Sequence, residues 1–199
     1  NGYVRGEGCG VAKLVGSKSQ QALPIGSAVR QDGRSASLTA PSGSAQEMLL
    51  RVALSKAAAP ALCAFEAHGT GTALGDPTEL GAIGRALALC GIAAQSLGAI
   101  KANVGHLEPA AGAAGLARLC LVLLQQAMMP NSELRVLNPL LTTCSLQLTV
   151  PQQAQPLASL RSCGSTVRSN ELTLGGVSSF GYSGTIAHAV LQAEQGAPP

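Results

Sequence analysis

The stretch from Pro109 to Ala127 is the part of the sequence that most limits what the chain can fold into. It opens with PAAGAAGLA and continues with leucines, so small or apolar side chains fill nearly every position. A helix that is apolar almost all round is normally buried in a protein core. We therefore expect a buried helix here, with other elements packed against it on every side.

Short strands and helices are predicted to alternate along the rest of the chain. Strands are expected over residues 23–30, 61–67 and 96–102, and helices over residues 44–59 and 109–127. The first helix has apolar residues at helical spacing and is stopped by Pro60. Residues 173–191 have strand-like stretches on either side of a glycine turn. This alternation favours an α/β layered fold.

The segment Asp76-Pro-Thr-Glu79 has the pattern of a helix start. Aspartate is a favoured N-cap, proline suits the first turn, and a glutamate three residues after the cap completes a capping box. We expect Asp76 and Glu79 to cap a helix, a role that is compatible with a contact to a lysine.

The composition disfavours several classes of protein. The net charge is only +3 and aromatic residues make up 2%, which does not suit a nucleic-acid-binding surface. The longest apolar run, residues 119–124, is far shorter than the roughly 20 residues of a membrane span. None of the six cysteines forms a C-x-x-C pair and the three histidines are widely spaced, so we expect no metal site. Cysteines in apolar surroundings favour a reducing, intracellular setting, most simply the cytoplasm.

Two segments place a histidine beside glycines: Glu66-Ala-His-Gly-Thr-Gly-Thr72 and Lys101-Ala-Asn-Val-Gly-His-Leu-Glu108. Histidine exchanges a proton near neutral pH, and glycine lets a ligand approach the backbone. His68 follows a predicted buried strand, and strand ends that lead into glycine turns are where α/β proteins bind ligands. The hydroxyls of Thr70 and Thr72 are candidates for binding a substrate amide. The alternative is a tight turn in which they bond their own backbone.

Lys101 has apolar neighbours, and a buried lysine needs a carboxylate partner. We expect Lys101 to be buried and paired with Glu79, with Asp76 as a second candidate. The alternative is a solvent-exposed charge. His188, within an apolar stretch, is interpreted as a structural strand residue.

These motifs resemble those of the β-ketoacyl synthases, the condensing enzymes of fatty-acid and polyketide assembly. The family order is also matched by segments that begin at Gly2 (GYVRGEG), Gln31 (QDG), Leu74 (LGDP), Asn138 (NP) and Val177 (VSSFGYSGT). Gly115 stands where the bacterial fatty-acid type has a glutamate, which favours the polyketide branch. Ile186 departs from the family, which has an asparagine there, so the glycine turn before it must be held differently.

The resemblance implies a thiolase-like layered α/β fold, of which this chain supplies mainly the second, C-terminal half. Residues 1–191 would form this part of the β-ketoacyl synthase domain, and residues 192–199 a linker or domain end. The sheet edge and the buried helix would then lack their natural partners.

The resemblance also implies a reaction. In the family, a cysteine thiolate accepts an acyl group from a carrier-protein thioester, and a malonyl-type extender loses carbon dioxide and attacks that acyl group. By motif match, His68 and His106 would assist decarboxylation and stabilise the enolate. Lys101 would hold the local electrostatics with Glu79 and Asp76 in support. The remaining implied contacts are those of Thr70 and Thr72 with the phosphopantetheine arm and of the Tyr182 backbone N–H with the oxyanion.

No bound cofactor is implied, because the substrate is carried on the phosphopantetheine of an acyl carrier protein. The full-length domain would be a homodimer, with no nucleic acid or membrane as partner. None of the six cysteines lies in the family's Ala-Cys-Ser-Ser context, so the chain is expected to lack the nucleophile. The alternatives are a non-condensing ketosynthase-like partner and an acyl- or carrier-protein-binding module.

Overall fold

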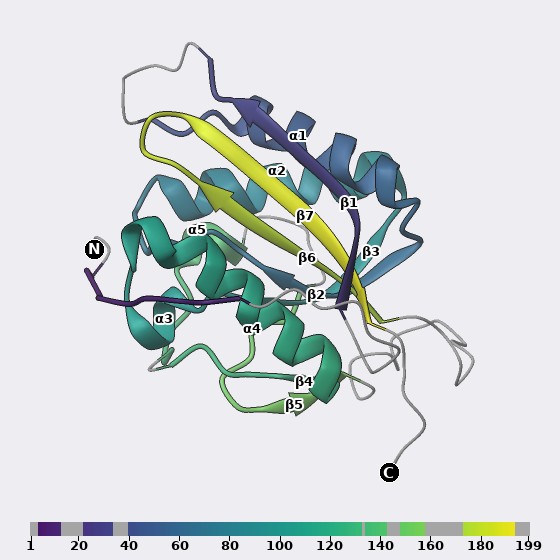
Figure 1. The fold of residues 1–199 in the computed structure, drawn as a ribbon. Coiled ribbons are helices and arrows are strands. Elements are labelled where there is room, and N and C mark those ends of the chain that lie inside the picture. Colours follow the sequence, from purple (N-terminus) through teal and green to yellow (C-terminus); the bar gives the residue numbers. More distant parts are fainter. Residues whose placement is uncertain are drawn as a thin grey trace.

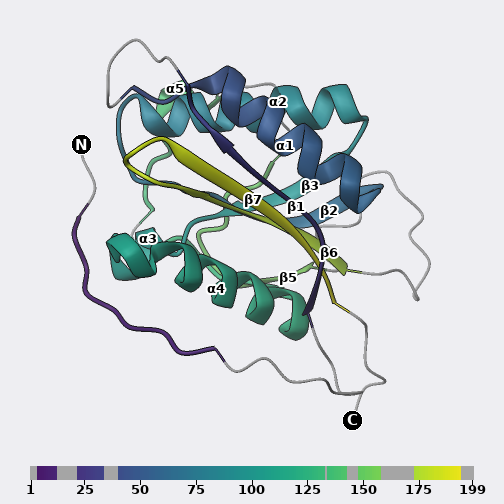
Figure 2. The same ribbon diagram turned by 45° about the horizontal axis from the view of Figure 1, so that its top comes forward.

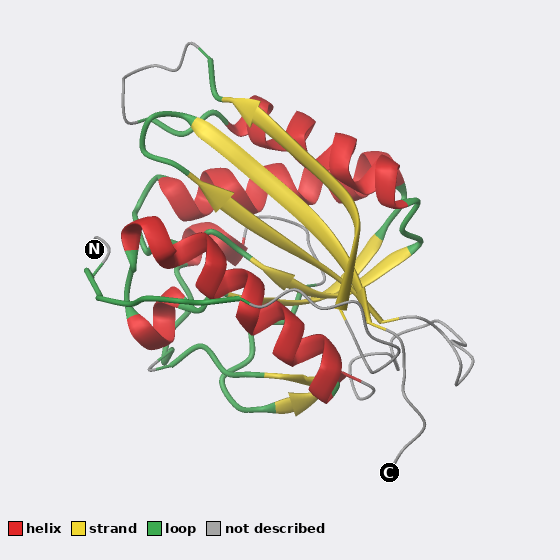
Figure 3. Cartoon of the chain, viewed as in Figure 1, coloured by secondary structure: helices red, strands yellow, loops and turns green. Residues whose placement is uncertain are grey.

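The computed structural model describes residues 4–12, 22–33, 40–132, 134–142, 148–157 and 173–193, and its centre is a five-stranded mixed sheet (Figure 3). The strands are β1 (Ala22–Gln31), β2 (Ala61–Glu66), β3 (Ala93–Gly98), β6 (Thr173–Phe180) and β7 (Thr185–Ala193). Their order in the sheet is β1-β7-β6-β2-β3. The pairs β1–β7 and β7–β6 are antiparallel, whereas β6, β2 and β3 run parallel.

Helices cover both faces of this sheet (Figures 1 and 2). The helices α1 (Gly43–Ala57) and α2 (Gly75–Cys90) lie on one face, and α4 (Ala111–Gln125) lies on the other. Neighbouring residues of β7 point to opposite faces of the sheet. Val190 packs against apolar residues of α1 and α2, and Leu191 packs against apolar residues of α4. This alternation is the period of two that a strand buried on both faces requires. The layered α/β architecture expected from the sequence is therefore present.

The remaining elements are short. They are α3 (Lys101–Val104), a 3₁₀ turn (Glu108–Ala110), β4 (Ala127–Met128), α5 (Pro139–Thr142) and β5 (Gln155–Pro156), with β4 and β5 paired as a separate two-stranded sheet. In the part of the chain that the structure describes, no helix is both long enough and apolar enough to cross a membrane.

The locally encoded elements agree with the sequence. The Ser42 hydroxyl caps α1 by accepting the N–H of Ala45, and Ala58 adopts a left-handed conformation that ends the helix just before Pro60. The strand predicted over residues 61–67 is β2. The strand predicted over residues 96–102 is wrong at its end, because β3 stops at Gly98 and Lys101 begins α3.

The sequence predicts a linker or a domain end over residues 192–199. Gln192 and Ala193 belong to β7, where they pair with the first residues of β1, so these two residues are the end of the domain rather than a linker. Residues 194–199 lie outside the described residues.

The helix α4 is buried on one side only. Leu119, Val122 and Leu123 are at most 1% exposed against the sheet, whereas Leu116 and Leu121 are 42% and 53% exposed on the outer side. The helix is apolar all round, as the sequence indicates, but the expectation that it is enclosed on every side is wrong for this chain.

His188 is buried in β7, as expected of a structural histidine. Its ring stacks on Phe65 with centroids 5.2 Å apart, and its Nδ1 shares a hydrogen bond of 3.0 Å with the Ser178 hydroxyl. Its Nε2 has no hydrogen-bond partner among the described residues. Burial lowers the pKa of His188 to about 3, so the ring is neutral at all ordinary pH values.

We expect His188 to make the stability of the chain fall in mild acid. Between pH 6.5 and about 3, His188 is protonated in the unfolded chain but stays neutral in the folded chain. The free energy of unfolding therefore falls as the pH falls from 6.5 toward 3. The loss is roughly 1.4 kcal/mol for each pH unit. Urea unfolding at pH 7 and pH 5.5 should therefore show a smaller pH effect in His188→Gln than in the natural chain. Glu79 and His68 contribute equally to the pH dependence of both proteins, so their contributions cancel when the two are compared. An equal pH dependence of unfolding in His188→Gln and in the natural chain would contradict the prediction.

Candidate active site

Two glycine-rich loops meet beside the carboxyl ends of β2 and β3. His68 lies in the loop after β2, and His106 follows the short helix α3. Their rings meet edge to face with centroids 5.7 Å apart, and both line a cavity of about 1270 Å³. The two loops converge because neighbouring parallel strands end at the same edge of a sheet. The structure thus brings together the two histidines that the sequence selected.

The turn between β6 and β7 forms another wall of this cavity. The backbone N–H of Phe180 donates to Nδ1 of His68 over 3.3 Å, and the Phe180 ring lies 5.1 Å from the imidazole. With Nδ1 accepting, the proton of the neutral ring is assigned to Nε2. Burial, followed by the nearby charges of Lys101 and His106, lowers the pKa of His68 to about 3. His68 is therefore a neutral hydrogen-bond donor at pH 7.

His106 has a related state. Its Nδ1 accepts the backbone N–H of Glu108 over 2.9 Å, which assigns the proton of its neutral ring to Nε2. Burial and the positive charge of Lys101 lower the pKa of His106 below its usual value. The cavity therefore holds two imidazoles that favour the neutral form.

The acidic side chains of α2 hold the His68 loop rather than the helix. Glu79 accepts the backbone N–H of His68 over 2.7 Å and that of Gly69 over 2.9 Å, and Asp76 accepts the N–H of Gly71 over 3.1 Å. The prediction that Asp76 and Glu79 form a capping box is wrong, because α2 already begins at Gly75. Gly69 and Gly71 have positive φ, which lets their amides turn toward these carboxylates. Burial raises the pKa of Glu79 to about 7.

The two threonines of the loop differ in their contacts. Thr72 Oγ1 accepts the backbone N–H of Gly75 over 3.1 Å, so it bonds its own turn at the start of α2, which was the alternative left open by the sequence. The Thr70 hydroxyl lies 3.3 Å from that of Thr72, and Thr70 lines both the histidine cavity and a second cavity of about 620 Å³. Thr70 is the better candidate for a ligand contact.

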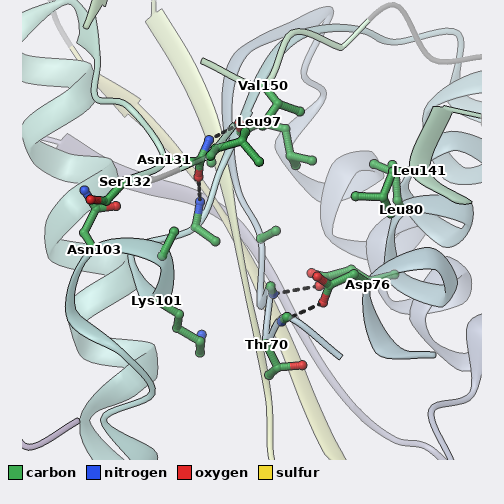
Figure 4. Close-up of a pocket in the computed structure, with 18 of the residues that line it drawn as sticks. Thr70, Asp76, Leu80, Leu97, Lys101, Asn103, Asn131, Ser132, Leu141 and Val150 are labelled. Carbon is green, nitrogen blue, oxygen red and sulfur yellow. Dashed lines mark hydrogen bonds between the residues drawn. The ribbon is translucent and has the colours of Figure 1, made fainter. Parts of the chain in front are cut away.

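Lys101 is half-buried rather than fully buried as predicted, and it lines the second cavity (Figure 4), which His106 lines as well. Burial lowers its pKa, and the negative charges of Glu79, Glu66 and Asp76 oppose that shift. Among the described residues, no carboxylate oxygen lies within 4.0 Å of its ammonium group. The ion pair predicted between Lys101 and Glu79 is therefore not formed, because the Glu79 oxygens face the backbone of the His68 loop. The carboxylates act on Lys101 through space, and the sequence analysis missed Glu66.

The β6–β7 turn presents backbone donors at the cavity rim. Gly181 N–H donates to the Thr185 carbonyl over 2.7 Å, but the Tyr182 N–H has no acceptor among the described residues. The Tyr182 side chain is 80% exposed. The turn is held from β1 by Gln31, whose amide donates to the Ser183 carbonyl over 2.8 Å and whose carbonyl accepts the Thr185 hydroxyl. Gln31 is a supporting residue that the sequence analysis did not single out.

Four cysteines lie in the described part of the chain, and none of them lines either cavity. They are Cys9, Cys63, Cys90 and Cys120. Cys144 and Cys163 lie outside the described residues. No group of three or more histidine, cysteine, aspartate or glutamate side chains is arranged as a metal site within the described ranges.

Comparison with known proteins gives a consistent result. The profile of the family described as Beta-ketoacyl synthase, C-terminal domain, matches residues 22–135. The chain is 39% identical to the polyketide synthase GfsA of Streptomyces halstedii over 202 residues, covering 97% of the chain and 3% of that protein. It is 38% identical to the highly reducing polyketide synthase Preu1 of Preussia isomera over 203 residues, covering 96% of the chain and 8% of that protein. The chain thus spans a small fraction of these relatives.

Solved structures agree with the fold. A ketosynthase from module 6 of the bacillaene synthase from Bacillus subtilis 168 superposes with a TM-score of 0.77 at 31% identity, covering 87% of this chain and 30% of that one. The oxazolomycin ketosynthase domain OzmH KS7 of Streptomyces albus JA3453 gives a TM-score of 0.75 at 32% identity, covering 89% and 31%. The thiolase-like α/β fold expected from the sequence is confirmed by these superpositions.

Proposed function

The chain belongs to the β-ketoacyl synthase family, as the C-terminal part of a ketosynthase of the polyketide synthase type, and we propose that it supplies the decarboxylating side of a condensing active site. The observation that carries this proposal is the cavity shared by His68 and His106, whose ring centroids are 5.7 Å apart, together with Lys101, which lines the adjoining second cavity with His106. Neutral donors that converge on one cavity are suited to a developing negative charge on oxygen.

The proposed first step is the loss of carbon dioxide from a malonyl-type thioester. The bond between the carboxylate carbon and the extender's C2 breaks, and its electron pair moves into the thioester as an enolate. The Nε2–H groups of His68 and His106 donate to the enolate oxygen, whose charge they stabilise. Burial keeps both rings neutral, and the positive charge of Lys101 adds to this effect by lowering their pKa values further.

In the proposed second step, the extender's C2 attacks an acyl group held on a cysteine thioester. A carbon–carbon bond forms, the carbon–sulfur bond breaks, and the cysteine leaves as a thiolate. The Tyr182 N–H, which has no acceptor among the described residues, stabilises the oxyanion of the tetrahedral intermediate. The nucleophilic cysteine comes from the N-terminal half of the ketosynthase. We use the term complete synthase for a polypeptide that contains both this chain and the N-terminal half of the ketosynthase.

The substrates would reach this site on the phosphopantetheine arm of an acyl carrier protein, and the complete synthase would act as a homodimer. Thr70 is the candidate contact for the arm, because it lines the histidine cavity and its hydroxyl is not committed to the backbone. Thr72 is committed to Gly75 and supports the loop.

The function is tested by supplying the complete synthase with acyl and malonyl groups on carrier protein. We expect carbon dioxide release and a β-ketoacyl product. Thr70→Val should raise KM for carrier-borne substrate about tenfold with a smaller change in kcat, because it removes one bond to the arm. Thr72→Val is the matched control, and it should lower Tm while changing KM little, because it removes a helix-start hydrogen bond. Carrier binding without decarboxylation would favour a non-condensing partner instead.

A further inference from the structure

The backbone that leads into Lys101 is held at every residue. The Gly98 carbonyl accepts the N–H of Ala67 over 2.8 Å, and this hydrogen bond continues the pairing of β2 with β3. The Ala99 N–H donates to Oδ1 of Asn131 over 3.0 Å. The Ile100 N–H donates to Oε1 of Glu66 over 2.6 Å. The position of Lys101 therefore depends on two buried side chains from elsewhere in the chain.

Glu66 and Arg118 form a buried ion pair beneath this link. They are 2% and 5% exposed, and the second Glu66 oxygen accepts a hydrogen bond from the Arg118 guanidinium. The guanidinium also donates to the Met129 carbonyl over 2.9 Å, which ties α4 to the segment that follows it. Gly98 leaves room for the guanidinium, because a Cβ at that position would collide with it. One carboxylate thus joins β2, α4 and the start of α3.

The charge of Glu66 also reaches Lys101. The carboxylates of Glu79, Glu66 and Asp76 all favour the ammonium form of Lys101, and none of them lies within 4.0 Å of it. Glu66 lines neither cavity, so a bound substrate does not touch it. Its influence on the reaction is therefore indirect, through the position and charge state of Lys101 and the position of His106.

We propose that Glu66 is a positioning residue for the decarboxylation, and that the buried Arg118 pairs with it and holds it aimed at the Ile100 N–H. The proposal rests on the proposed function of the same site. Glu66 anchors the first turn of α3, and His106 follows α3 directly, so loss of this anchor displaces the lysine and one histidine together. The charges that bear on Lys101 are Glu66 from β2, Glu79 and Asp76 from α2, and the two histidine rings when protonated.

The test compares three variants of the complete synthase. Glu66→Gln keeps an acceptor for Ile100 but removes the charge, and the double variant Glu66→Gln, Arg118→Gln also removes the unpaired buried cation that would otherwise destabilise the fold. Glu47→Gln is the matched control, because Glu47 pairs with Arg85 at 2.9 Å on the surface between α1 and α2. We expect Glu66→Gln to lower kcat for decarboxylation 10- to 100-fold with KM within about threefold, because the side chain loses both the ion pair with Arg118 that aims it and the charge that acts on Lys101. The double variant should recover Tm but not kcat.

The second readout is the pH dependence of Lys101 modification by an amine-reactive reagent, followed by mass spectrometry of the peptide that contains it. Removing the Glu66 charge lowers the pKa of Lys101, so the midpoint of modification should move to lower pH in both the single and the double variant, but not in Glu47→Gln. An unchanged midpoint, or a double variant with the natural kcat, would overturn the positioning role. This readout needs no turnover, so it separates the two proposals. If the natural complete synthase is inactive but the Glu66 variants still shift the midpoint of Lys101 modification, the proposed function is refuted and the effect of Glu66 on Lys101 still holds.

Discussion

Replacing His68 or His106 with alanine is expected to lower decarboxylation by the complete synthase about 10²- to 10³-fold, the usual effect of removing one donor aimed at a developing oxyanion. Both rings line the same cavity, and each is assigned an Nε2 proton because its Nδ1 accepts a backbone N–H. The double variant should lose less than the product of the two single effects, because the two donors act on one oxygen. The rate of decarboxylation is measured as the release of labelled carbon dioxide from malonyl carrier protein.

Two further variants make the test specific. Glutamine at position 106 restores an N–H donor, so His106→Gln should recover part of the activity that His106→Ala loses. His188→Gln is the matched control, because His188 is a buried histidine whose pKa is lowered to about 3, like that of His68, but it does not line the cavity. It should retain the natural rate. A full rate in His68→Ala would remove the donor role from the proposal.

The parts of the fold that could be predicted are those set by neighbouring residues. The capping serine and apolar spacing of α1, and the apolar run of β2, act over a few positions and were placed correctly. The end of β3 could not be predicted, because Ile100 and Ala99 are held by Glu66 and Asn131, which lie 34 and 32 residues away from them respectively. Lys101 starts a helix for that reason, although its sequence reads as the end of a strand.

The candidate site shows the same division. The shared role of His68 and His106 was implied by two glycine-containing motifs that match the family, and the structure brings them together because neighbouring parallel strands end at one edge of the sheet. The role of Glu79 was misassigned, since a capping-box pattern and a carboxylate that holds the His68 loop look alike in sequence. The pairing of Glu66 with Arg118 joins residues 52 positions apart and leaves no local signal.

The second large effect concerns the chain by itself, which we expect to form no β-ketoacyl product. Condensation needs an acyl thioester on a cysteine beside the groups that activate it. Cys63 lies within β2 and Cys90 at the end of α2 opposite to Glu79, and neither lines the histidine cavity. Burial raises the pKa of the Cys120 thiol, which disfavours the reactive thiolate. Cys9 is exposed and also lies outside the cavity.

Weak decarboxylation by the isolated chain would still be compatible with the proposal, because His68, His106 and Lys101 are all present in it. The decisive comparison is therefore product formation, measured with acyl- and malonyl-loaded carrier protein for the chain and for the complete synthase under the same conditions. Alkylation of all six cysteines should leave residual decarboxylation by the chain unchanged, since no cysteine takes part in that step. A β-ketoacyl product from the chain at a rate near that of the complete synthase, lost on alkylation, would mean that one of its own cysteines is the nucleophile and that the proposed division of the active site is wrong.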